Sequence, residues 1–251
     1  MPQTSLSGKT VIVGGASRNL GALVAETLAA EGADVVVHYH TDSSAAKAAD
    51  VVGAVERAGR RAISHQADLS TSTAVRSLFD AAEAEFGPVH AVVNTAGMVV
   101  KKPMAEVSDD EYDEMFAVNT KAAFLVMREA ASRVAEGGKI VTIVTSLLAA
   151  YAPEYSVYAG SKAPVEHFTR ALSKELMDRQ VSVNAVAPGP MDTPFFYPAE
   201  TDESVAFHKS QAMGGQLTRI EDIAPIVRFL LTEGWWINGQ TLFANGGYTT
   251  R

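Results

Sequence analysis

Two residues of the chain, Tyr158 and Lys162, have side chains and a spacing that suit proton transfer. A helix places a phenol and an ammonium four residues apart on the same face. A neighbouring positive charge lowers the pKa of a phenol, so the pair could give a proton to a carbonyl oxygen or take one from an alcohol. We therefore expect hydride chemistry, which also needs a hydride carrier.

A glycine-bearing turn early in the chain could hold that carrier. Residues 14–21 follow an apolar run and precede a helical pattern, where backbone N–H groups can approach the pyrophosphate of a dinucleotide. A tight strand-to-helix connection has the same pattern, so the turn alone is a weak signal. Asn19 replaces a glycine here, and asparagine tolerates the left-handed backbone. The candidate contacts are Gly15, Ser17, Arg18, Asn19, Leu20 and Gly21.

The end of the second expected strand indicates which nucleotide binds. An acidic residue there would hold the ribose hydroxyls of NAD, but the chain has Tyr39, His40 and Thr41, with no carboxylate before Asp42. Arg18 in the glycine turn would attract an additional phosphate, unless it is only a solvated surface residue. The local charge favours NADP(H), with Tyr39, His40 and Thr41 as candidate contacts.

Short β-branched runs alternate with longer amphipathic stretches, the rhythm of a parallel α/β sheet. The expected fold is a doubly wound, Rossmann-type parallel sheet of seven strands in one domain, residues 1–251. The expected strands are 10–13, 34–38, 62–66, 91–94, 140–144, 182–186 and 241–244. The expected helices are 21–31, 44–58, 71–86, 108–135, 156–178 and 220–232.

Residues 188–218 show no clear strand or full helix but carry several aromatic side chains. A long apolar insertion beyond a strand end is a common place for a substrate lid, expected here around 190–216; a surface loop with buried anchors is the alternative. The side chains that could line an apolar pocket, or belong to the core, are Met98, Leu147, Leu148, Tyr151, Tyr155 and those of 194–197.

Composition excludes several classes of partner. The 251 residues carry a formal charge of -8, which argues against nucleic acid and anionic membranes as partners. No apolar run approaches the length of a membrane span, and the opening residues carry no signal segment. The chain has no cysteine, which fits a reducing compartment, so we expect a cytoplasmic location. We also expect no metal site.

The whole chain resembles the short-chain dehydrogenase/reductase family. The resemblance is carried by an ordered series: the glycine turn, Asp68-Leu69, Asn94-Thr95-Ala96-Gly97, Asn119, Tyr158-Ala159-Gly160-Ser161-Lys162, Pro188-Gly189, and Asn238-Gly239-Gln240 before Asn245-Gly246-Gly247. It implies that Tyr158 is the catalytic acid/base, that Lys162 also holds the nicotinamide ribose, and that Asn119 supports a water relay. It implies further cofactor contacts at Asp68, Leu69, Asn94, Ala96, Gly97, Pro188, Gly189, Met191 and Thr193.

The hydroxyl that would polarise the substrate carbonyl is ambiguous. The family usually has a serine thirteen residues before the tyrosine, a position occupied here by Thr145, whereas Ser146 is twelve residues before Tyr158. An ungapped alignment of the preceding strand selects Thr145, and residue identity slightly favours Ser146. Both could also simply cap a strand end.

Other departures from the family pattern are Gly14, Asn19, Asn245 and Pro164. Pro164 removes a hydrogen bond from the expected active-site helix, which we expect to bend after Lys162. The family resemblance also implies a homotetramer, in which apolar material around Trp235, Trp236 and the last strand would be covered.

The expected function is an NADPH-dependent reductase of a ketone or aldehyde, reversible as an alcohol dehydrogenase. A catalytically idle protein that senses NADP(H) is the alternative. The combination of Tyr158, Lys162 and Asn119 argues against it, because a sensor needs none of these side chains. A methyltransferase with a glycine turn would leave Tyr158 and Lys162 unexplained.

Overall fold

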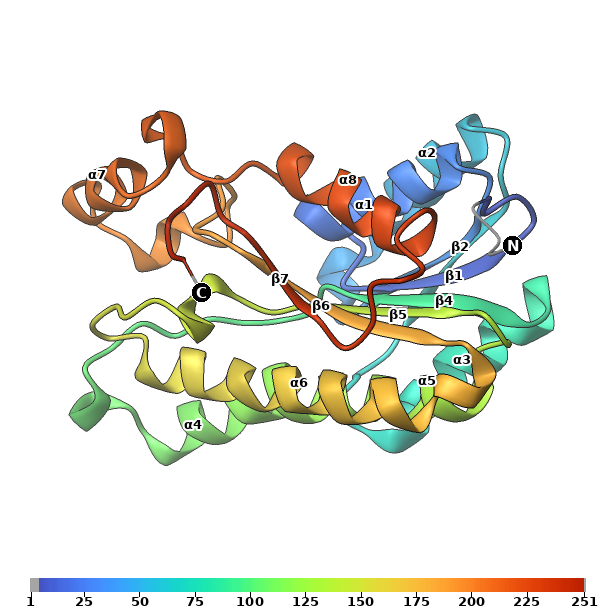
Figure 1. Ribbon diagram of the computed structural model, residues 1–251, viewed down its shortest axis with the longest axis horizontal. Helices are drawn as coiled ribbons and strands as arrows, with labels where there is room; N and C mark the ends of the chain where they lie inside the picture. The colour runs from blue at the N-terminus through green and yellow to red at the C-terminus, as the bar shows by residue number, and fades with distance from the viewer. Residues whose placement is uncertain (1–4, 251) are drawn as a thin grey trace.

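The apolar runs of the chain pair into one parallel sheet in the computed structural model, which describes residues 5–250 (Figure 1). The strand order is β3-β2-β1-β4-β5-β6-β7, so the chain changes direction beside β1, where a crevice opens at the carboxyl ends of the strands. The expected seven-stranded Rossmann-type sheet is confirmed, with small shifts at the strand ends. The strands are β1 (Thr10–Gly14), β2 (Asp34–Tyr39), β3 (Ala62–Gln66), β4 (Val89–Asn94), β5 (Lys139–Ile143), β6 (Ser182–Pro188) and β7 (Thr241–Ala244).

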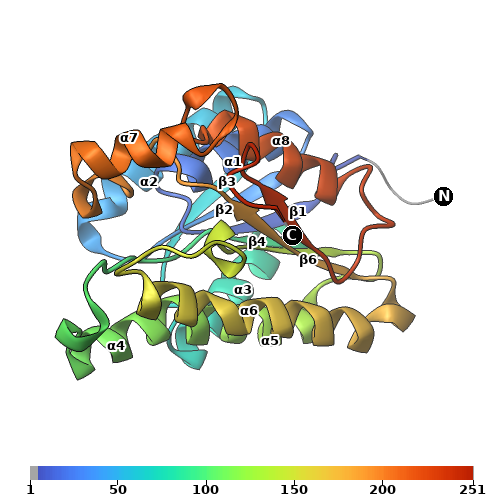
Figure 2. The ribbon, with the colours of Figure 1, turned by 60° about the vertical axis from the view of Figure 1, so that its left-hand side comes forward.

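Helices cover both faces of the sheet (Figures 1 and 2). One layer contains α1 (Asn19–Ala30), α2 (Ala45–Arg57) and α8 (Ile220–Leu231), and the other contains α3 (Ser72–Phe86), α5 (Ala122–Arg133) and α6 (Ser156–Glu175). Alternate side chains of β1 enter the two cores: Ile12 packs in the core with α3 and α5, whereas Val11 and Val13 pack in the core with α1 and α8. Burial on both faces explains the apolar run Val11-Ile12-Val13 of β1.

The expected helix over 108–135 is divided in the structure. It consists of α4 (Asp109–Phe116), a π-helical segment (Ala117–Lys121) and then α5. Ser108 and Glu111 form a capping box that fixes the start of α4. In contrast, α6 continues through Pro164 as one helix.

The segment 190–216 contains a helix that the sequence pattern did not predict, α7 (Asp202–Ser210), which begins with a capping box between Thr201 and Ser204. Figure 1 places α7 beyond the end of the sheet, on the side of α8. Short 3₁₀ turns occupy Asp42–Ser44, Met104–Glu106, Ser146–Leu148, Met177–Arg179, Tyr197–Ala199 and Met213–Gly215. Within residues 5–250, no helix combines the length and the apolar character needed to cross a bilayer.

Candidate active site

A long groove at the carboxyl ends of the strands collects most of the predicted cofactor contacts. Its lining includes Gly15, Ser17, Arg18, Asn19, Leu20, Gly21, Tyr39, His40, Thr41, Asp68, Leu69, Ala96, Gly97, Tyr158, Lys162, Met191 and Thr193. Three other predicted contacts lie outside it: Asn94 is buried at the end of β4, and Pro188 and Gly189 line a second, adjoining pocket. Residues separated by more than a hundred positions are thus brought to one crevice by the strand order.

The glycine turn has the backbone that a close approach to a ligand requires. Gly15 has φ +74, and a β-carbon on Gly21 would lie 2.2 Å from the carbonyl oxygen of Gly15. The expectation that Asn19 adopts the left-handed region is confirmed by its φ of 49. No side chain caps the start of α1, so the backbone N–H groups of its first turn, beside the groove, are open to an anion.

His38 holds this turn in place, a role that the sequence reasoning missed. The N–H of Gly15 donates to Nδ1 of His38 at 2.9 Å, and Nε2 of His38 bonds to the carbonyl oxygen of Ala67 at 2.9 Å. The backbone oxygen of His38 also accepts from the N–H of Ala16. Because Nδ1 accepts, the proton of the neutral ring is on Nε2. The available signal was a polar side chain within the apolar run of β2.

Burial lowers the pKa of His38 from 6.5 to about 4, although the bond to Ala67 opposes the shift. The folded state therefore favours the neutral ring, and this stabilisation is complete above pH 6.5 and is lost as the pH falls towards about 4. The shift corresponds to roughly 3 kcal/mol. We expect the free energy of unfolding of wild type to fall between about pH 7 and 4.5 by a few kcal/mol more than that of His38→Gln. Urea unfolding at both pH values measures this difference.

His65→Gln is the matched control for this experiment, because His65 is half-buried and lies on the neighbouring strand β3. Its removal should change the pH dependence much less. Equal pH dependence in wild type and His38→Gln would contradict the buried neutral state of His38.

At the end of β2, where a carboxylate would be needed to bind the ribose hydroxyls of NAD, no carboxylate lines the groove. Asp42, the first carboxylate after β2, accepts a hydrogen bond from Gln66 at 2.8 Å and is absent from the groove lining. The exposed side chains of Arg18 and His40 do line it. Asp68 lines the groove too, and its carboxylate accepts from the N–H of Ser70. The charges of the side chains near the end of β2 therefore suit the additional 2′-phosphate of NADP(H).

Behind the groove, the loop after β4 packs closely against the glycine turn and the side chain of Lys162. Oδ1 of Asn94 accepts from the N–H of Ala96, and the Thr95 hydroxyl donates to the carbonyl oxygen of Gly14 at 2.8 Å. A β-carbon on Gly97 would lie 2.9 Å from Nζ of Lys162, so a side chain at this position would displace the ammonium from its present place. Asn94 therefore shapes the loop, and Thr95 was a missed groove residue between two predicted ones.

Tyr158 and Lys162 both lie on α6 and line the groove, as the four-residue spacing predicts. Burial raises the pKa of Tyr158 to about 12, and a hydrogen bond with Thr145 opposes this shift. Burial lowers the pKa of Lys162 to about 8, and Nζ donates to the carbonyl oxygen of Ile143 at 3.2 Å. The expected lowering of the phenol pKa is not seen, because desolvation outweighs the favourable contact. At neutral pH Tyr158 is a phenol and can donate its proton.

Asn119 lies in the π-helical segment between α4 and α5. Its side chain exchanges two hydrogen bonds with the backbone of Met98, each 2.9 Å long, and donates to the hydroxyl of Ser161 on α6. Its Oδ1 is near Gly97, beside the end of Lys162. Asn119 thus joins the loop after β4 to α6.

The two candidate hydroxyls have different surroundings. The Thr145 hydroxyl accepts from the N–H of Leu147 and forms the hydrogen bond with Tyr158 that opposes the rise in the pKa of this phenol. The Ser146 hydroxyl donates to the carbonyl oxygen of Ala187 at 3.1 Å and accepts from Nδ2 of Asn245 at 3.0 Å. Ser146 is 1% exposed and serves to join β5, β6 and the C-terminal segment.

A second pocket adjoins the groove and is largely apolar. It is lined by Val99, Val144, Thr145, Ser146, Leu147, Tyr155, Tyr158, Pro188, Gly189, Pro190, Met191, Thr193, Phe195, Phe196, Ala199, His208 and Tyr248. Of the expected pocket residues, Leu147, Tyr155, Phe195 and Phe196 do line it, whereas Met98 lines the groove instead and Tyr151 is fully exposed. The other three, Leu148, Pro194 and Tyr197, line neither hollow. Tyr158 lines both hollows, so this residue lies where the two meet. Among residues 5–250 no cluster of side chains could hold a metal ion.

Known proteins are similar to this chain along nearly its entire length. A family model described as Enoyl-(Acyl carrier protein) reductase matches residues 15–249. A "Short-chain type dehydrogenase/reductase" of Picea abies is 42% identical, over 96% of this chain and 93% of its own length. An "NADPH-dependent aldehyde reductase 2, chloroplastic" of Arabidopsis thaliana is 40% identical, over 98% of this chain and 96% of its own length.

A solved structure of a putative dehydrogenase from Burkholderia cenocepacia with bound NADP superposes with a TM-score of 0.97. It is 52% identical, and the match covers 99% of this chain and 96% of that one. The matched region thus includes the glycine turn, α6 and the 190–216 segment.

Proposed function

The chain belongs to the short-chain dehydrogenase/reductase family, and from this premise we propose that it reduces a ketone or aldehyde with NADPH, reversibly, with Tyr158 as the acid/base. It is an NADP(H)-dependent oxidoreductase. The observation that carries the proposed mechanism is the position of Tyr158 at the junction of the groove and the apolar pocket. A proton donor there can reach a substrate carbonyl while the substrate faces the groove.

The groove fits the dinucleotide in shape and chemistry. Gly15 and Gly21 let the turn pack closely on itself and on the loop after β4, and the uncapped start of α1 suits a pyrophosphate. Arg18, His40 and Thr41 would surround the 2′-phosphate, and Gly97 leaves room for the Lys162 ammonium beside a ribose. We assign the predicted contacts at Met191 and Thr193 to the carboxamide end, because both residues line both hollows. When bound, NADPH supplies the hydride.

The protein groups then have separate tasks. Tyr158 holds a proton at neutral pH, because burial raises the pKa of its phenol to about 12, and it delivers this proton to the carbonyl oxygen. Lys162 places positive charge beside the forming phenolate and stabilises it. Asn119 positions Lys162 and α6 through Met98 and Ser161.

Thr145 is our candidate for the hydroxyl that polarises the carbonyl, which departs from the slight preference for Ser146 that residue identity gives. In its support, the lone pairs of Thr145 accept the N–H of Leu147, which leaves its O–H to donate towards the position of Tyr158. Ser146 already uses its proton and a lone pair inside the protein.

Incubation with NADPH and a panel of ketones and aldehydes, followed by nicotinamide absorbance, tests the proposed function. The alternative, an idle NADP(H) sensor, would bind NADPH and turn over none of them. It is disfavoured by the apolar pocket, because a protein that only senses the cofactor needs no second hollow at Tyr158.

The preference for NADPH should depend on Arg18. A charge-assisted contact to the 2′-phosphate contributes about 1.5–3 kcal/mol, on the order of ten- to a hundredfold in affinity. We expect kcat/KM with NADPH to exceed that with NADH by about this factor, and Arg18→Ala to shrink the gap while hardly changing the NADH rate. Steady-state kinetics with both cofactors measure the gap. Equal use of the two cofactors by wild type would contradict the assignment, as would a gap that Arg18→Ala leaves unchanged.

We also propose a cytoplasmic homotetramer. Trp235 and Trp236, which shortly precede the edge strand β7 in the chain, are 42% and 82% exposed in the single chain. Apolar surface of this size next to a sheet edge favours burial against another subunit. The compartment rests on the absence of cysteine from the sequence.

A further inference from the structure

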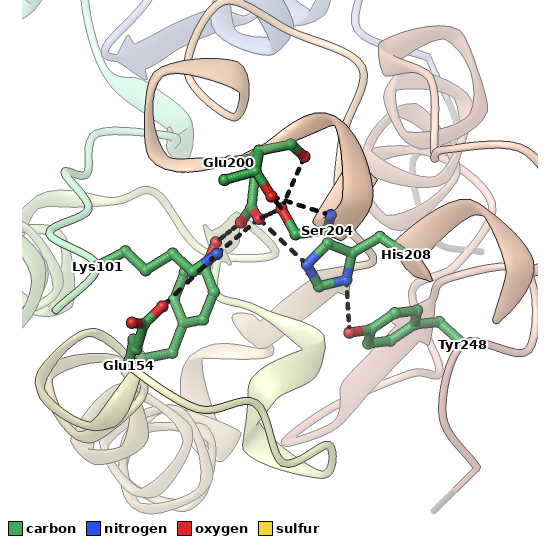
Figure 3. A network of polar contacts seen from close by, with 8 residues as sticks. Lys101, Glu154, Glu200, Ser204, His208 and Tyr248 are labelled. Carbon is green, nitrogen blue, oxygen red and sulfur yellow. Dashed lines mark hydrogen bonds and ion pairs between the residues drawn. The ribbon is translucent and has the colours of Figure 1, made fainter. Parts of the chain in front are cut away.

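A buried polar cluster forms part of the wall of the apolar pocket (Figure 3). Its centre is Glu200, whose side chain has no exposed surface. Nζ of Lys101 lies 2.7 Å from Oε2 of Glu200, and the hydroxyls of Tyr155 and Ser204 also donate to this carboxylate. The cluster joins the 190–216 segment to the loop after β4 and to the start of α6. We call it the Glu200 cluster, with His208 and Tyr248 as its remaining members.

Glu200 is ionised in this setting. Burial acts to raise its pKa, but hydrogen bonds from Lys101, Ser204 and Tyr155 outweigh burial and lower it. A carboxylate with these donors is fixed both in charge and in position.

The fixed carboxylate determines the tautomer of His208. Nε2 of His208 lies 3.7 Å from Oε2 of Glu200, and Nδ1 lies 3.0 Å from the hydroxyl of Tyr248, as Figure 3 shows. Burial lowers the pKa of His208, so the ring carries one proton at neutral pH, with Lys101 supporting and Glu200 opposing this effect. The carboxylate attracts an N–H and repels a lone pair. The proton is therefore on Nε2, and Nδ1 is an acceptor.

This assignment orients the hydroxyl of Tyr248. Burial raises the pKa of Tyr248, so it keeps its proton, and it must donate that proton to Nδ1 of His208. Within residues 5–250, the bond to His208 is the one hydrogen bond that the hydroxyl forms. The oxygen then retains lone pairs but no free proton. Both residues line the pocket that holds Thr145 and Tyr158.

We propose that Tyr248 is a specificity-determining residue, and that the substrate is a carbonyl compound with a second, hydrogen-bond-donating group, such as a hydroxyl, that donates to the Tyr248 oxygen. The remaining pocket wall is apolar and aromatic, with Leu147, Phe195 and Phe196, which favours a hydroxyaryl carbonyl compound. The proposal rests on the carbonyl-reductase function. A group that only accepts hydrogen bonds would meet the Tyr248 lone pairs and gain nothing.

Binding in the presence of NADP⁺ tests this inference without turnover. The probes are acetophenone and its ortho, meta and para hydroxy and methoxy derivatives, titrated calorimetrically into the enzyme–NADP⁺ complex. We expect at least one hydroxy isomer to bind about fivefold more tightly than acetophenone and its methoxy counterpart, the ratio for one net neutral hydrogen bond. Tyr248→Phe should reduce this ratio to about one.

Two further variants make the test specific. His208→Leu removes the acceptor of the Tyr248 proton, so the hydroxyl becomes free to donate and the preference for hydroxy over methoxy ligands should shrink. Tyr151→Phe removes a hydroxyl from a fully exposed tyrosine and should leave the ratio at about fivefold. Thermal unfolding of each variant separates loss of structure from loss of the contact.

The inference is overturned if no hydroxy isomer binds more tightly than acetophenone and its methoxy counterpart, or if the preference survives Tyr248→Phe. A ratio that stays unchanged in His208→Leu would overturn the orientation of the hydroxyl. Failure of the proposed function has a different signature, because the wild-type enzyme would then bind these ligands without oxidising NADPH.

Discussion

Replacing Tyr158 by Phe should abolish carbonyl reduction while leaving NADPH affinity within a few-fold of wild type. The substitution removes the hydroxyl at the junction of the groove and the apolar pocket and keeps the aromatic ring. General acid catalysis contributes on the order of a hundred- to ten-thousandfold to such a step. The loss should appear in kcat, because the proton moves only in the transition state.

The loss of catalysis is measured as kcat with a ketone that the wild-type enzyme reduces. NADPH affinity is measured separately by fluorescence. Tyr151→Phe is the matched control, since it removes the same atom from a fully exposed side chain. A Tyr158→Phe enzyme with more than about a tenth of the wild-type kcat would remove Tyr158 from the role of acid. Parallel loss of NADPH binding would indicate damage to the groove instead.

The central strands of this protein, β2, β1, β4, β5 and β6, were predictable because nearly all of their residues are buried between the two helical layers. In β2, the run Val35-Val36-Val37 has few alternatives to the interior of a parallel sheet. The groove residues followed from this, since they come directly after strands whose carboxyl ends share one edge of the sheet. The role of His38 could not be predicted in this way, because its two hydrogen bonds join it to Gly15 and Ala67, which only the folded sheet brings together.

The division of the expected helix 108–135 could not be read from hydrophobic periodicity. A π-helical segment adds a residue without changing composition, and Asn119 makes its defining contacts with Met98, distant in sequence. The same holds for the 190–216 segment. Its helix α7 begins with a polar capping box, and the contact of His208 with Tyr248 spans forty residues. Hydrophobic periodicity indicates which face of a single helix or strand is buried. It carries no information on contacts between residues that are distant in sequence.

The assignment of the polarising hydroxyl yields the second large effect. We expect Thr145→Ala to lower kcat roughly a hundredfold, because a donor aimed at the developing oxyanion contributes about 2.7–4 kcal/mol. Thr145→Ser keeps the hydroxyl and loses one methyl, so it should retain most of the activity. Steady-state kcat with one ketone and saturating NADPH ranks the variants.

Ser146→Ala provides the contrasting case, because its hydroxyl is already bonded to Ala187 and Asn245. Removing it leaves a buried carbonyl oxygen without that donor, which costs about 1–3 kcal/mol of stability. The midpoint of thermal unfolding should therefore fall while kcat changes little. A hundredfold loss of kcat in Ser146→Ala, with Thr145→Ala nearly silent, would reverse the assignment. Near-normal kcat in both would place the polarising donor on another residue of the pocket.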